Sequence, residues 1–309
     1  MAGKQAYQLF DITLARRTQV SPSLVRFTFT GPDVRQMASY APDQRIKLFF
    51  AQPGADLTPL FEYPPSQDWY SAYQALPDAI RPFMRTYTIR ALRPALGEVD
   101  IEFVLHGDTG PASRWAMNAR PGDTLAMVAP RAGAPGPHLG FEWKPPKGVR
   151  RILLMADETA VPAAVGILEE LRGHTAPPRI EAFFEVPCED DAQPLADTAW
   201  LARSTLPARE HGERLLEAVR GIDLAREIEI LGGKPGRALE NESGISEAEE
   251  SDAPFWEPAC ADDGEPFYAW IAAETRVARK LRRYLVNECG VPKRCVASMG
   301  YWRQGQAGG

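Results

Sequence analysis

The hydrophobic pattern of this chain changes its period at residues 131–148, a segment crowded with proline and glycine, and this change constrains the fold most. Before the segment, short runs rich in β-branched and aromatic residues are separated by Pro, Gly and Asp, which is typical of strands. These runs are residues 25–30, 46–51, 85–91, 100–105 and 124–129. Short strands at this spacing predict an antiparallel Greek-key β-barrel, in which the long segment 55–83 forms a loop with a short helix.

Beyond residue 148, strands of the buried type alternate with helical patterns. Strands are predicted at residues 151–156, 179–186, 269–273 and 294–299, and helices at 161–172 and 275–289. Strand alternating with helix predicts an α/β domain built on a parallel sheet. We therefore expect two domains, residues 1–132 and 150–309, joined by a linker at 133–149.

Charge and cysteine usage exclude several classes of protein. The net charge is −6, which argues against a general nucleic-acid binder. No stretch approaches the roughly 18 apolar residues of a membrane span, and the first ten residues lack the pattern of a signal peptide, so a cytoplasmic protein is expected. The four cysteines form no CxxC pair, which argues against an iron–sulfur cluster, a structural zinc or any other metal site. Electron transfer by this chain would need an organic cofactor.

An acidic segment interrupts the second domain. Residues 238–274 contain no Lys or Arg, while nine Asp and Glu side chains gather between 240 and 263. A segment of low hydrophobicity with charges of a single sign is typical of a mobile loop, and we predict one at residues 238–266. A role of this segment in binding a basic partner protein is left open. The oligomeric state is expected to be a monomer or a weak dimer.

The first motif with chemical content is RTYTIR, residues 85–90. In a strand, alternation places Arg85 and Tyr87 on one face and Thr86 and Thr88 on the other. An aromatic face can stack on a flat ring system, a hydroxyl can bond the edge of that ring, and an arginine can neutralise a phosphate. Taken alone, the motif is equally typical of an ordinary strand with a surface arginine.

The second motif is HGDTGPASRWA, residues 106–116. Gly107 and Gly110 permit an unusual backbone, and Pro111 is suited to the first position of a helix. The free amides of Ala112 and Ser113 would then face an anion, assisted by the helix dipole. A Gly-Pro turn that opens a helix is common, but together with RTYTIR it predicts a site for a flavin dinucleotide.

These two motifs, with DETAVPA at 157–163 and GYWRQG at 300–305, resemble the signature of siderophore-interacting proteins, a branch of the ferredoxin-reductase-like superfamily. The resemblance covers both domains, from about residue 9 to residue 305. It implies an FAD-binding barrel, an NAD(P)H-binding α/β domain and a reductase of ferric siderophores. Electrons would pass from NAD(P)H to the flavin and then to Fe(III), so that Fe(II) is released without any protein ligand to iron.

The resemblance also implies roles for individual residues. Arg85 would bind the flavin phosphate, Tyr87 would pack on the isoalloxazine, and Thr88 would bond near its reactive edge. The other residues expected at the FAD are Thr86, His106, Gly110, Pro111, Ala112, Ser113 and Trp115. Those expected at the nicotinamide end of NAD(P)H are Asp157, Glu158, Thr159, Ala160 and Glu274.

One position departs from the family pattern. The family usually reads Ala-Gly-Glu after its penultimate strand, whereas this chain reads Ala272-Ala273-Glu274. The added methyl of Ala273 is expected to narrow the approach of a cofactor at that point.

The ferric siderophore would need positive charge near the flavin, because such complexes are often anionic. Lys47 points away from its neighbours Ile46 and Leu48, and the resemblance places a lysine of this strand at the substrate cavity. On the predicted helix after Glu274, spacing places Arg276, Arg279 and Arg283 on one face, opposite an apolar stripe of Val277, Leu281 and Leu285. Lys47 and Arg279 are the predicted catalytic residues, with a solvated helix face as the alternative for the arginine.

Two other functions remain open on the sequence. One is a flavin reductase with a protein acceptor or donor such as ferredoxin. The other is a non-catalytic module that binds ferric siderophores or senses them through a flavin. A yellow protein that NAD(P)H bleaches would exclude the pure carrier.

Overall fold

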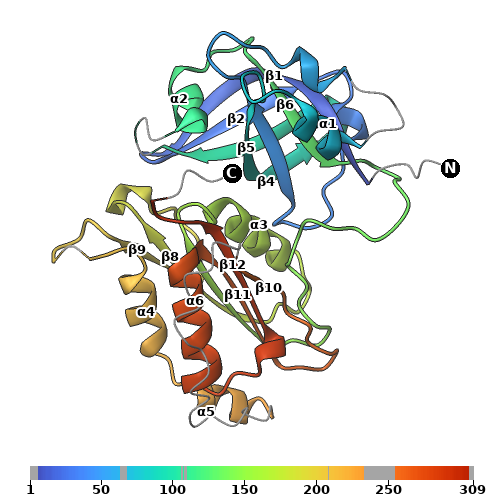
Figure 1. Cartoon of the computed structure of the whole chain (residues 1–309). Coiled ribbons are helices and arrows are strands. Elements are labelled where there is room, and N and C mark those ends of the chain that lie inside the picture. The colour runs from blue at the N-terminus through green and yellow to red at the C-terminus, as the bar shows by residue number, and fades with distance from the viewer. Residues whose placement is uncertain are drawn as a thin grey trace. The chain divides into compact units, whose positions relative to one another are not determined.

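The computed structural model describes residues 6–62, 68–105, 107, 110–207, 209–232 and 255–305. The chain divides into two compact units, Met1–Phe141 with Ala307–Gly309, and Glu142–Gln306 (Figure 1). The boundary at residue 141 falls inside the segment 133–149 that the sequence predicts as a linker. Each unit is described by itself.

The first unit is a closed antiparallel barrel of six strands. They are β1 (Tyr7–Ser21), β2 (Leu24–Thr30), β3 (Arg45–Phe50), β4 (Phe83–Arg93), β5 (Glu98–Val104) and β6 (Thr124–Pro130). Their order around the barrel is β1-β2-β5-β4-β3-β6, and the first half of β1 pairs with β6 to close it. The predicted barrel is thus confirmed. The long strand β1 was not predicted; it pairs with both β6 and β2, with an irregularity at Leu14/Arg16 where the register shifts.

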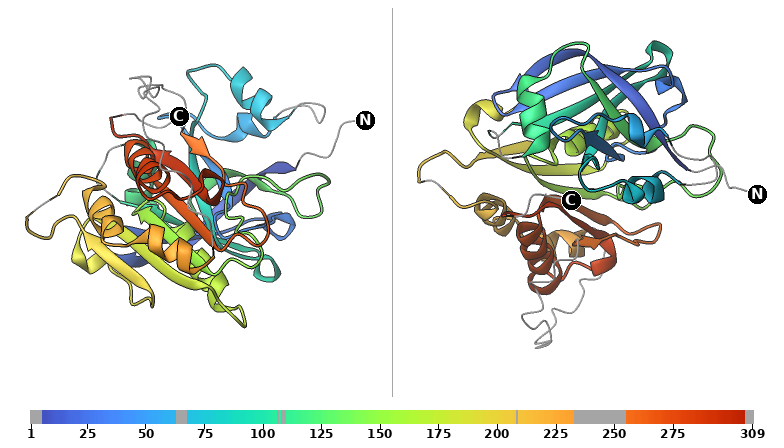
Figure 2. Two further views of the ribbon diagram at one scale, coloured as in Figure 1. Left: turned by 90° about the horizontal axis from the view of Figure 1, so that it is seen from below. Right: turned by 45° about the horizontal axis from the view of Figure 1, so that its top comes forward.

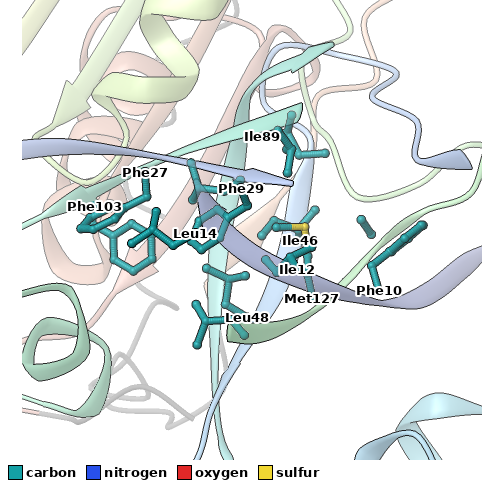
Figure 3. Packing of buried hydrophobic residues seen from close by; sticks show 14 of the residues in the cluster. Phe10, Ile12, Leu14, Phe27, Phe29, Ile46, Leu48, Ile89, Phe103 and Met127 are labelled. Carbon is teal, nitrogen blue, oxygen red and sulfur yellow. The ribbon is translucent and has the colours of Figure 1, made fainter. Parts of the chain in front are cut away.

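Alternating side chains fill the barrel. Phe10, Ile12 and Leu14 of β1 face inward with Phe27 and Phe29 of β2, all of them buried (Figure 3). The helix α2 (Pro111–Asn118) contributes to the same core. Burial of these large apolar groups is the main favourable term in holding the strands together.

A smaller apolar cluster lies on the outer face of the barrel. Phe49 of β3 and Val128 of β6 pack there with Trp69 and Tyr73 of the helix α1 (Trp69–Ala75). This helix and the short turn η2 (Thr58–Leu60) lie in the segment 55–83, as predicted. Two further short turns of this unit are η1 (Val34–Gln36) and η3 (Pro94–Leu96).

The second unit is built on a six-stranded sheet. Its strands are β7 (Arg151–Asp157), β8 (Arg179–Val186), β9 (Thr198–Ala202), β10 (Trp256–Glu257), β11 (Phe267–Glu274) and β12 (Val296–Trp302). The order is β10-β12-β11-β7-β8-β9, parallel except for β10 at the edge. After β7, the chain adds β8 and β9 on one side of β7, and it later adds β11 on the opposite side of β7. The strand order therefore reverses between β7 and β11, the place where open α/β sheets bind ligands.

Helices cover this sheet. The helices are α3 (Val161–Arg172), α4 (Glu213–Arg220), α5 (Leu224–Ile230) and α6 (Thr275–Arg283), with the short turns η4 (Glu189–Asp191) and η7 (Lys293–Cys295). α4, α5 and α6 share one core with the sheet residues Leu153, Met155 and Ile271, and Figure 2 shows α4 and α6 side by side. None of the helices in the described ranges has the length and apolarity needed to cross a bilayer.

Two expectations for the second unit need correction. The predicted helix 275–289 continues beyond α6 as the π-helix η6 (Tyr284–Glu288), so its α-helical part is shorter. The predicted loop 238–266 is not all loop, because β10 pairs Trp256 with Met299 of β12. Residues 238–254 of that loop, like His106 of the flavin motif, lie outside the described residues. The strand β9 and the helices α4 and α5 were not predicted.

Candidate functional site

The strand β4 carries the first predicted motif, and its pairing with β3 fixes which way each side chain points. Arg85 lies opposite Leu48 and Tyr87 opposite Ile46, and both partners face the barrel core. Thr86 lies opposite Lys47 on the outer face of the barrel. Cross-strand partners share a face, so the predicted alternation of the RTYT motif is confirmed.

Arg85 is a half-buried cation without an acidic partner in the described part of the chain. Its Nη1 donates to the Met84 carbonyl at 2.8 Å, and no described carboxylate forms an ion pair with it. Desolvation lowers the pKa of Arg85, although Tyr87 and Tyr73 oppose this effect. A guanidinium that is partly stripped of water gains most from an anion that it can grip with two N–H groups, such as a phosphate.

Tyr87 extends the aromatic wall of the barrel. Its ring lies 4.2 Å, centroid to centroid, from Phe103 and is tilted by 33°. Burial raises the pKa of Tyr87, with Arg85 opposing, so the phenol stays neutral. A half-buried neutral aromatic ring next to an unsatisfied cation fits a flat ring system that carries a phosphate. Its neighbour Thr88 is nearly buried, with 8% of its surface exposed.

The start of α2 provides the second half of the predicted flavin site. Gly110 precedes Pro111, the first helical residue, and no side chain of the described residues caps this helix end. A Cβ at Gly110 would meet no atom within 4 Å, so the backbone is open on that side. The amides of Ala112 and Ser113 are therefore suited to a phosphate. The Trp115 ring packs against the rings of Phe27 and Phe50, with centroid distances of 5.5 and 5.9 Å.

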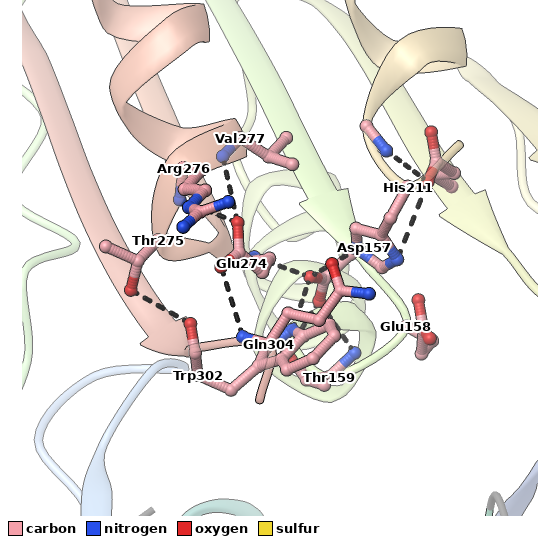
Figure 4. A network of polar contacts seen from close by, with 12 residues as sticks. Asp157, Glu158, Thr159, His211, Glu274, Thr275, Arg276, Val277, Trp302 and Gln304 are labelled. Carbon is pink, nitrogen blue, oxygen red and sulfur yellow. Dashed lines mark hydrogen bonds and ion pairs between the residues drawn. The ribbon is translucent and has the colours of Figure 1, made fainter. Parts of the chain in front are cut away.

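At the carboxyl end of β7, the buried side chain of Asp157 accepts five hydrogen bonds (Figure 4). One oxygen accepts from the amide and hydroxyl of Thr159 at 2.9 and 2.5 Å. The other lies 3.1 Å from His211 Nε2 and accepts from the Glu274 amide at 2.7 Å and from Trp302 Nε1 at 2.8 Å. One carboxylate thus joins the ends of β7, β11 and β12 to the loop before α4, across the point where the strand order reverses.

The sequence predicted Asp157, Thr159 and Glu274 at this edge but missed His211 and the indole of Trp302. His211 lies 54 residues from Asp157 in the chain, and its ring stands edge-on to Trp302 at 5.1 Å. A single histidine between Glu and Gly carries no sequence signal for such a contact. Ala160, also predicted, is fully buried and lies just before α3, where its amide donates to the Asp157 carbonyl at 3.0 Å.

Two of the predicted carboxylates already have protein partners. Glu158 forms a two-pronged ion pair with Arg203, with N–O distances of 2.6 and 2.8 Å. Glu274 caps α6, since its Oε2 accepts from the Arg276 amide at 2.6 Å and the Val277 amide at 3.2 Å. The carboxylate of Glu274 therefore stabilises the start of α6.

Asp157, Glu158 and His211 bring potential ligand atoms within 4.8 Å of one another. The oxygens of Asp157 nevertheless serve five donors, and both oxygens of Glu158 serve Arg203. A cation here would have to displace these partners. The cluster is therefore better suited to organising the sheet edge than to holding a metal.

The His211–Asp157 pair should make the stability of the second unit depend on pH. Burial lowers the pKa of His211, but the hydrogen bond and the negative charge of Asp157 raise it by more, so the net shift is upward. Burial raises the pKa of Asp157, but His211, Thr159 and Trp302 hold it below the ordinary carboxyl value. His211 thus contributes fully to the free energy of unfolding below about pH 6.5, and this contribution is lost as pH rises through its raised pKa. Asp157 contributes fully above about pH 4, and its contribution is lost as pH falls through its lowered pKa.

We expect the urea midpoint of the second unit to fall as pH rises from about 6.5, and this fall to be absent in His211→Gln. The exposed His174 provides the matched control, His174→Gln. A wild-type pH profile retained in His211→Gln would contradict the assignment.

Gly300 of the closing motif has no room for a side chain. A Cβ there would lie 2.5 Å from Thr275 Oγ1 and 3.1 Å from Thr275 Cα. Gly300→Ala should therefore lower the free energy of unfolding by about 1–3 kcal/mol, measured by urea denaturation, because the strand must shift away from α6. The same change should cost less in a Thr275→Ala background, and equal costs in both backgrounds would contradict this explanation.

Ala273 is the residue at which this chain departs from the Ala-Gly-Glu pattern of the family. Ala273 is fully buried and belongs to the core shared with α4 and α6, opposite Gly300 of β12. Its methyl therefore contributes to the packing of that core.

Arg279, the second predicted catalytic residue, lies on α6 with its guanidinium 5.1 Å above the ring of Phe255. Val277, Leu281 and Leu285 are buried, which confirms the predicted apolar stripe. Lys47 belongs to the first unit and Arg279 to the second.

Comparison with known families finds a match in each unit. A family model described as siderophore-interacting FAD-binding domain matches residues 13–134, and one described as siderophore-interacting protein matches residues 149–305. Among solved structures, the siderophore-interacting protein SipS from Aeromonas hydrophila is 27% identical, with a TM-score of 0.63 and coverage of 98% of this chain and 94% of that one. A ferredoxin NADP+ reductase from Neisseria gonorrhoeae shares the fold at 13% identity, with a TM-score of 0.52 and coverage of 92% of each chain.

Named relatives include two reductases and a transporter. The ferric vibriobactin reductase of Vibrio cholerae is 24% identical over 96% of this chain and 89% of its own length. The ferric acinetobactin reductase of Acinetobacter baumannii is 27% identical over 73% of this chain and 62% of its own length. A mycobactin import ATP-binding/permease protein of Mycolicibacterium smegmatis is 26% identical over 96% of this chain, which spans 26% of that protein's length.

Proposed function

This chain belongs to the siderophore-interacting protein family, and on that premise we propose that it is an FAD-dependent reductase of ferric siderophores that takes electrons from NAD(P)H. Bound FAD would supply the exchange between a two-electron donor and the one-electron acceptor Fe(III). The reductases of V. cholerae and A. baumannii support this assignment by their names and by similarity along most of this chain.

The observation that carries the proposal is the pairing of Arg85 with Tyr87 on one face of β4. The half-buried guanidinium, without an acidic partner in the described residues, fits the flavin phosphate, and the neutral phenol ring fits the isoalloxazine. The open helix start at Gly110 to Ser113 fits the remaining phosphate of FAD. Thr88 would bond the reactive edge of the ring.

In the second unit, we propose that the edge formed by residues 157–160 receives the nicotinamide end of NAD(P)H. Asp157 would not touch the nucleotide, because its oxygens already serve the protein; it would hold the loop in shape. Thr159, half-exposed at the start of α3, is the better candidate for contact.

The proposed substrate is an anionic ferric siderophore, with Lys47 and, separately, Arg279 supplying positive charge to it. Lower charge on the iron weakens its bonds to hard oxygen ligands, so reduction releases Fe(II). We also propose that the protein acts in the cytoplasm as a monomer or weak dimer. Its four cysteines are all free thiols, which fits a reducing compartment.

The test is anaerobic reduction of the purified yellow protein by NADH or NADPH, followed by addition of ferric chelates and a ferrous trap. We expect bleaching of the flavin absorption, its return on adding ferric chelate, and trapped Fe(II) in proportion. Lys47→Met should keep the bleaching but slow the return. Bleaching that is reversed by ferredoxin and not by any ferric chelate would refute the siderophore assignment in favour of a protein acceptor.

A further inference from the structure

Thr86, the second residue of the flavin motif, points away from the proposed flavin face and contacts Lys47. The two residues are direct cross-strand partners on the outer face of the barrel. Lys47 Nζ donates to Thr86 Oγ1 at 2.5 Å. The sequence predicted Thr86 as a residue of the cofactor site, but its hydroxyl is engaged by the proposed substrate lysine.

The surroundings of Lys47 explain why this hydroxyl matters. On its other side, Lys47 lies opposite Val128 of β6, which belongs to the outer apolar cluster. Burial lowers the pKa of Lys47, and the positive charge of Arg45, two residues earlier in β3, lowers it further. The ammonium has therefore lost part of its hydration next to a like charge, and a hydrogen-bond acceptor restores part of that loss.

The hydrogen bond also limits where the ammonium can go. A lysine side chain has four rotatable bonds and a large rotamer entropy, so a free one would sample many positions. Over the ranges that the structure describes, Thr86 is the one side chain that hydrogen-bonds to Lys47. An ammonium has three donors, so this contact fixes Nζ and leaves donors for a ligand.

We propose that Thr86 is the positioning residue of Lys47, and that its hydroxyl holds the ammonium charged and in place for the oxygen-rich face of an anionic ferric chelate. The proposal rests on the role given above to Lys47 in the reductase. It assigns the side chain of Thr86 to the substrate rather than to the flavin.

The test compares Thr86→Val, which keeps the shape of the side chain but removes the acceptor, with Thr86→Ser, which keeps the acceptor. The ligands are gallium(III) chelates, which match ferric ones in charge and size but are not reduced. We expect Thr86→Val to bind an anionic gallium tris-catecholate about tenfold more weakly than the wild type. Binding of a neutral gallium trihydroxamate should not change, and Thr86→Ser should resemble the wild type for both.

A pH profile separates positioning from a merely structural role. Affinity for the anionic chelate should fall at alkaline pH as Lys47 loses its proton. Loss of the acceptor destabilises the ammonium, so in Thr86→Val this fall should move to lower pH. Arg45 on β3 is the charged group next to Lys47, while the residues facing it from β4 and β6, Thr86 and Val128, are uncharged.

The outcomes distinguish this inference from the proposed function. Equal affinity of the wild type and Thr86→Val for the anionic chelate, or an alkaline limb that does not move, would overturn the positioning role. So would Thr86→Ser behaving like Thr86→Val, since packing and not the hydroxyl would then matter. If gallium binding depends on Thr86 as expected but no ferric chelate is reduced, the positioning role stands and the reductase proposal fails.

Discussion

Replacing Asp157 by asparagine should lower the free energy of unfolding of the second unit by about 3–5 kcal/mol. Every group that faces the Asp157 carboxylate is a donor or, in His211, a ring nitrogen whose raised pKa favours the charged, donating form. An asparagine amide would turn an NH₂ group toward at least two of these donors. In one orientation of the amide, the Trp302 indole and the Glu274 amide would lose their acceptor, and in the other the Thr159 amide would lose its own.

Urea denaturation followed by tryptophan fluorescence measures this effect, because Trp302 itself reports on the site. Asp190→Asn, at an exposed carboxylate of the same unit, provides the control and should change the urea midpoint little. A midpoint for Asp157→Asn equal to that of the control would show that the network contributes nothing to stability. We also expect Asp157→Asn to weaken NAD(P)H-dependent bleaching, since the loop at 157–160 would no longer be held.

The barrel could be predicted because its signal is local. Runs such as residues 25–30 and 100–105 alternate inward and outward with period two, and turn residues separate them. The parallel sheet was equally visible through its buried strands. The strand β9 and the helices α4 and α5 escaped prediction, since the five-residue β9 is half-exposed and α5 spans seven residues, too short for a clear period.

The site was predictable only in part, for a physical reason. A motif such as RTYT fixes direction through strand geometry, so Arg85 and Tyr87 could be placed on one face from the sequence. The contacts of Asp157 with His211 and Trp302 join residues 54 and 145 positions away, and no local pattern encodes them. The capping role of Glu274 at the start of α6 was likewise not predicted, although its place after a buried strand was visible in the sequence.

The Lys47–Thr86 contact was predictable only in part. Alternation placed each residue on its face, yet the pairing needs the register of β3 against β4, which the sequence does not display. Two residues predicted for separate roles, one for the substrate and one for the cofactor, therefore turned out to share a hydrogen bond.

Replacing Arg85 by glutamine should weaken FAD binding about 100-fold, the effect expected when a charge-assisted bidentate contact to phosphate is lost. Arg85 is partly desolvated and has no ion pair in the described residues, so little in the apoprotein depends on its charge. Arg85→Gln should therefore fold normally. The FAD affinity of Arg85→Lys should lie between those of the wild type and Arg85→Gln, because an ammonium keeps the charge but cannot form two parallel hydrogen bonds to one phosphate. Quenching of flavin fluorescence on titration measures the affinity, with Arg16→Gln on the exposed Arg16–Glu98 pair as the control.

FMN and FAD together locate the phosphate that Arg85 binds. If Arg85 grips the phosphate nearest the isoalloxazine, Arg85→Gln should weaken FMN and FAD binding by the same factor, because FMN carries that phosphate. A change at the start of α2, such as Ser113→Pro, removes an amide that is proposed to face the second phosphate and should weaken FAD alone. Loss of FAD affinity in Arg85→Gln with FMN affinity unchanged would move Arg85 to the second phosphate, and wild-type affinity for both would remove it from the flavin site.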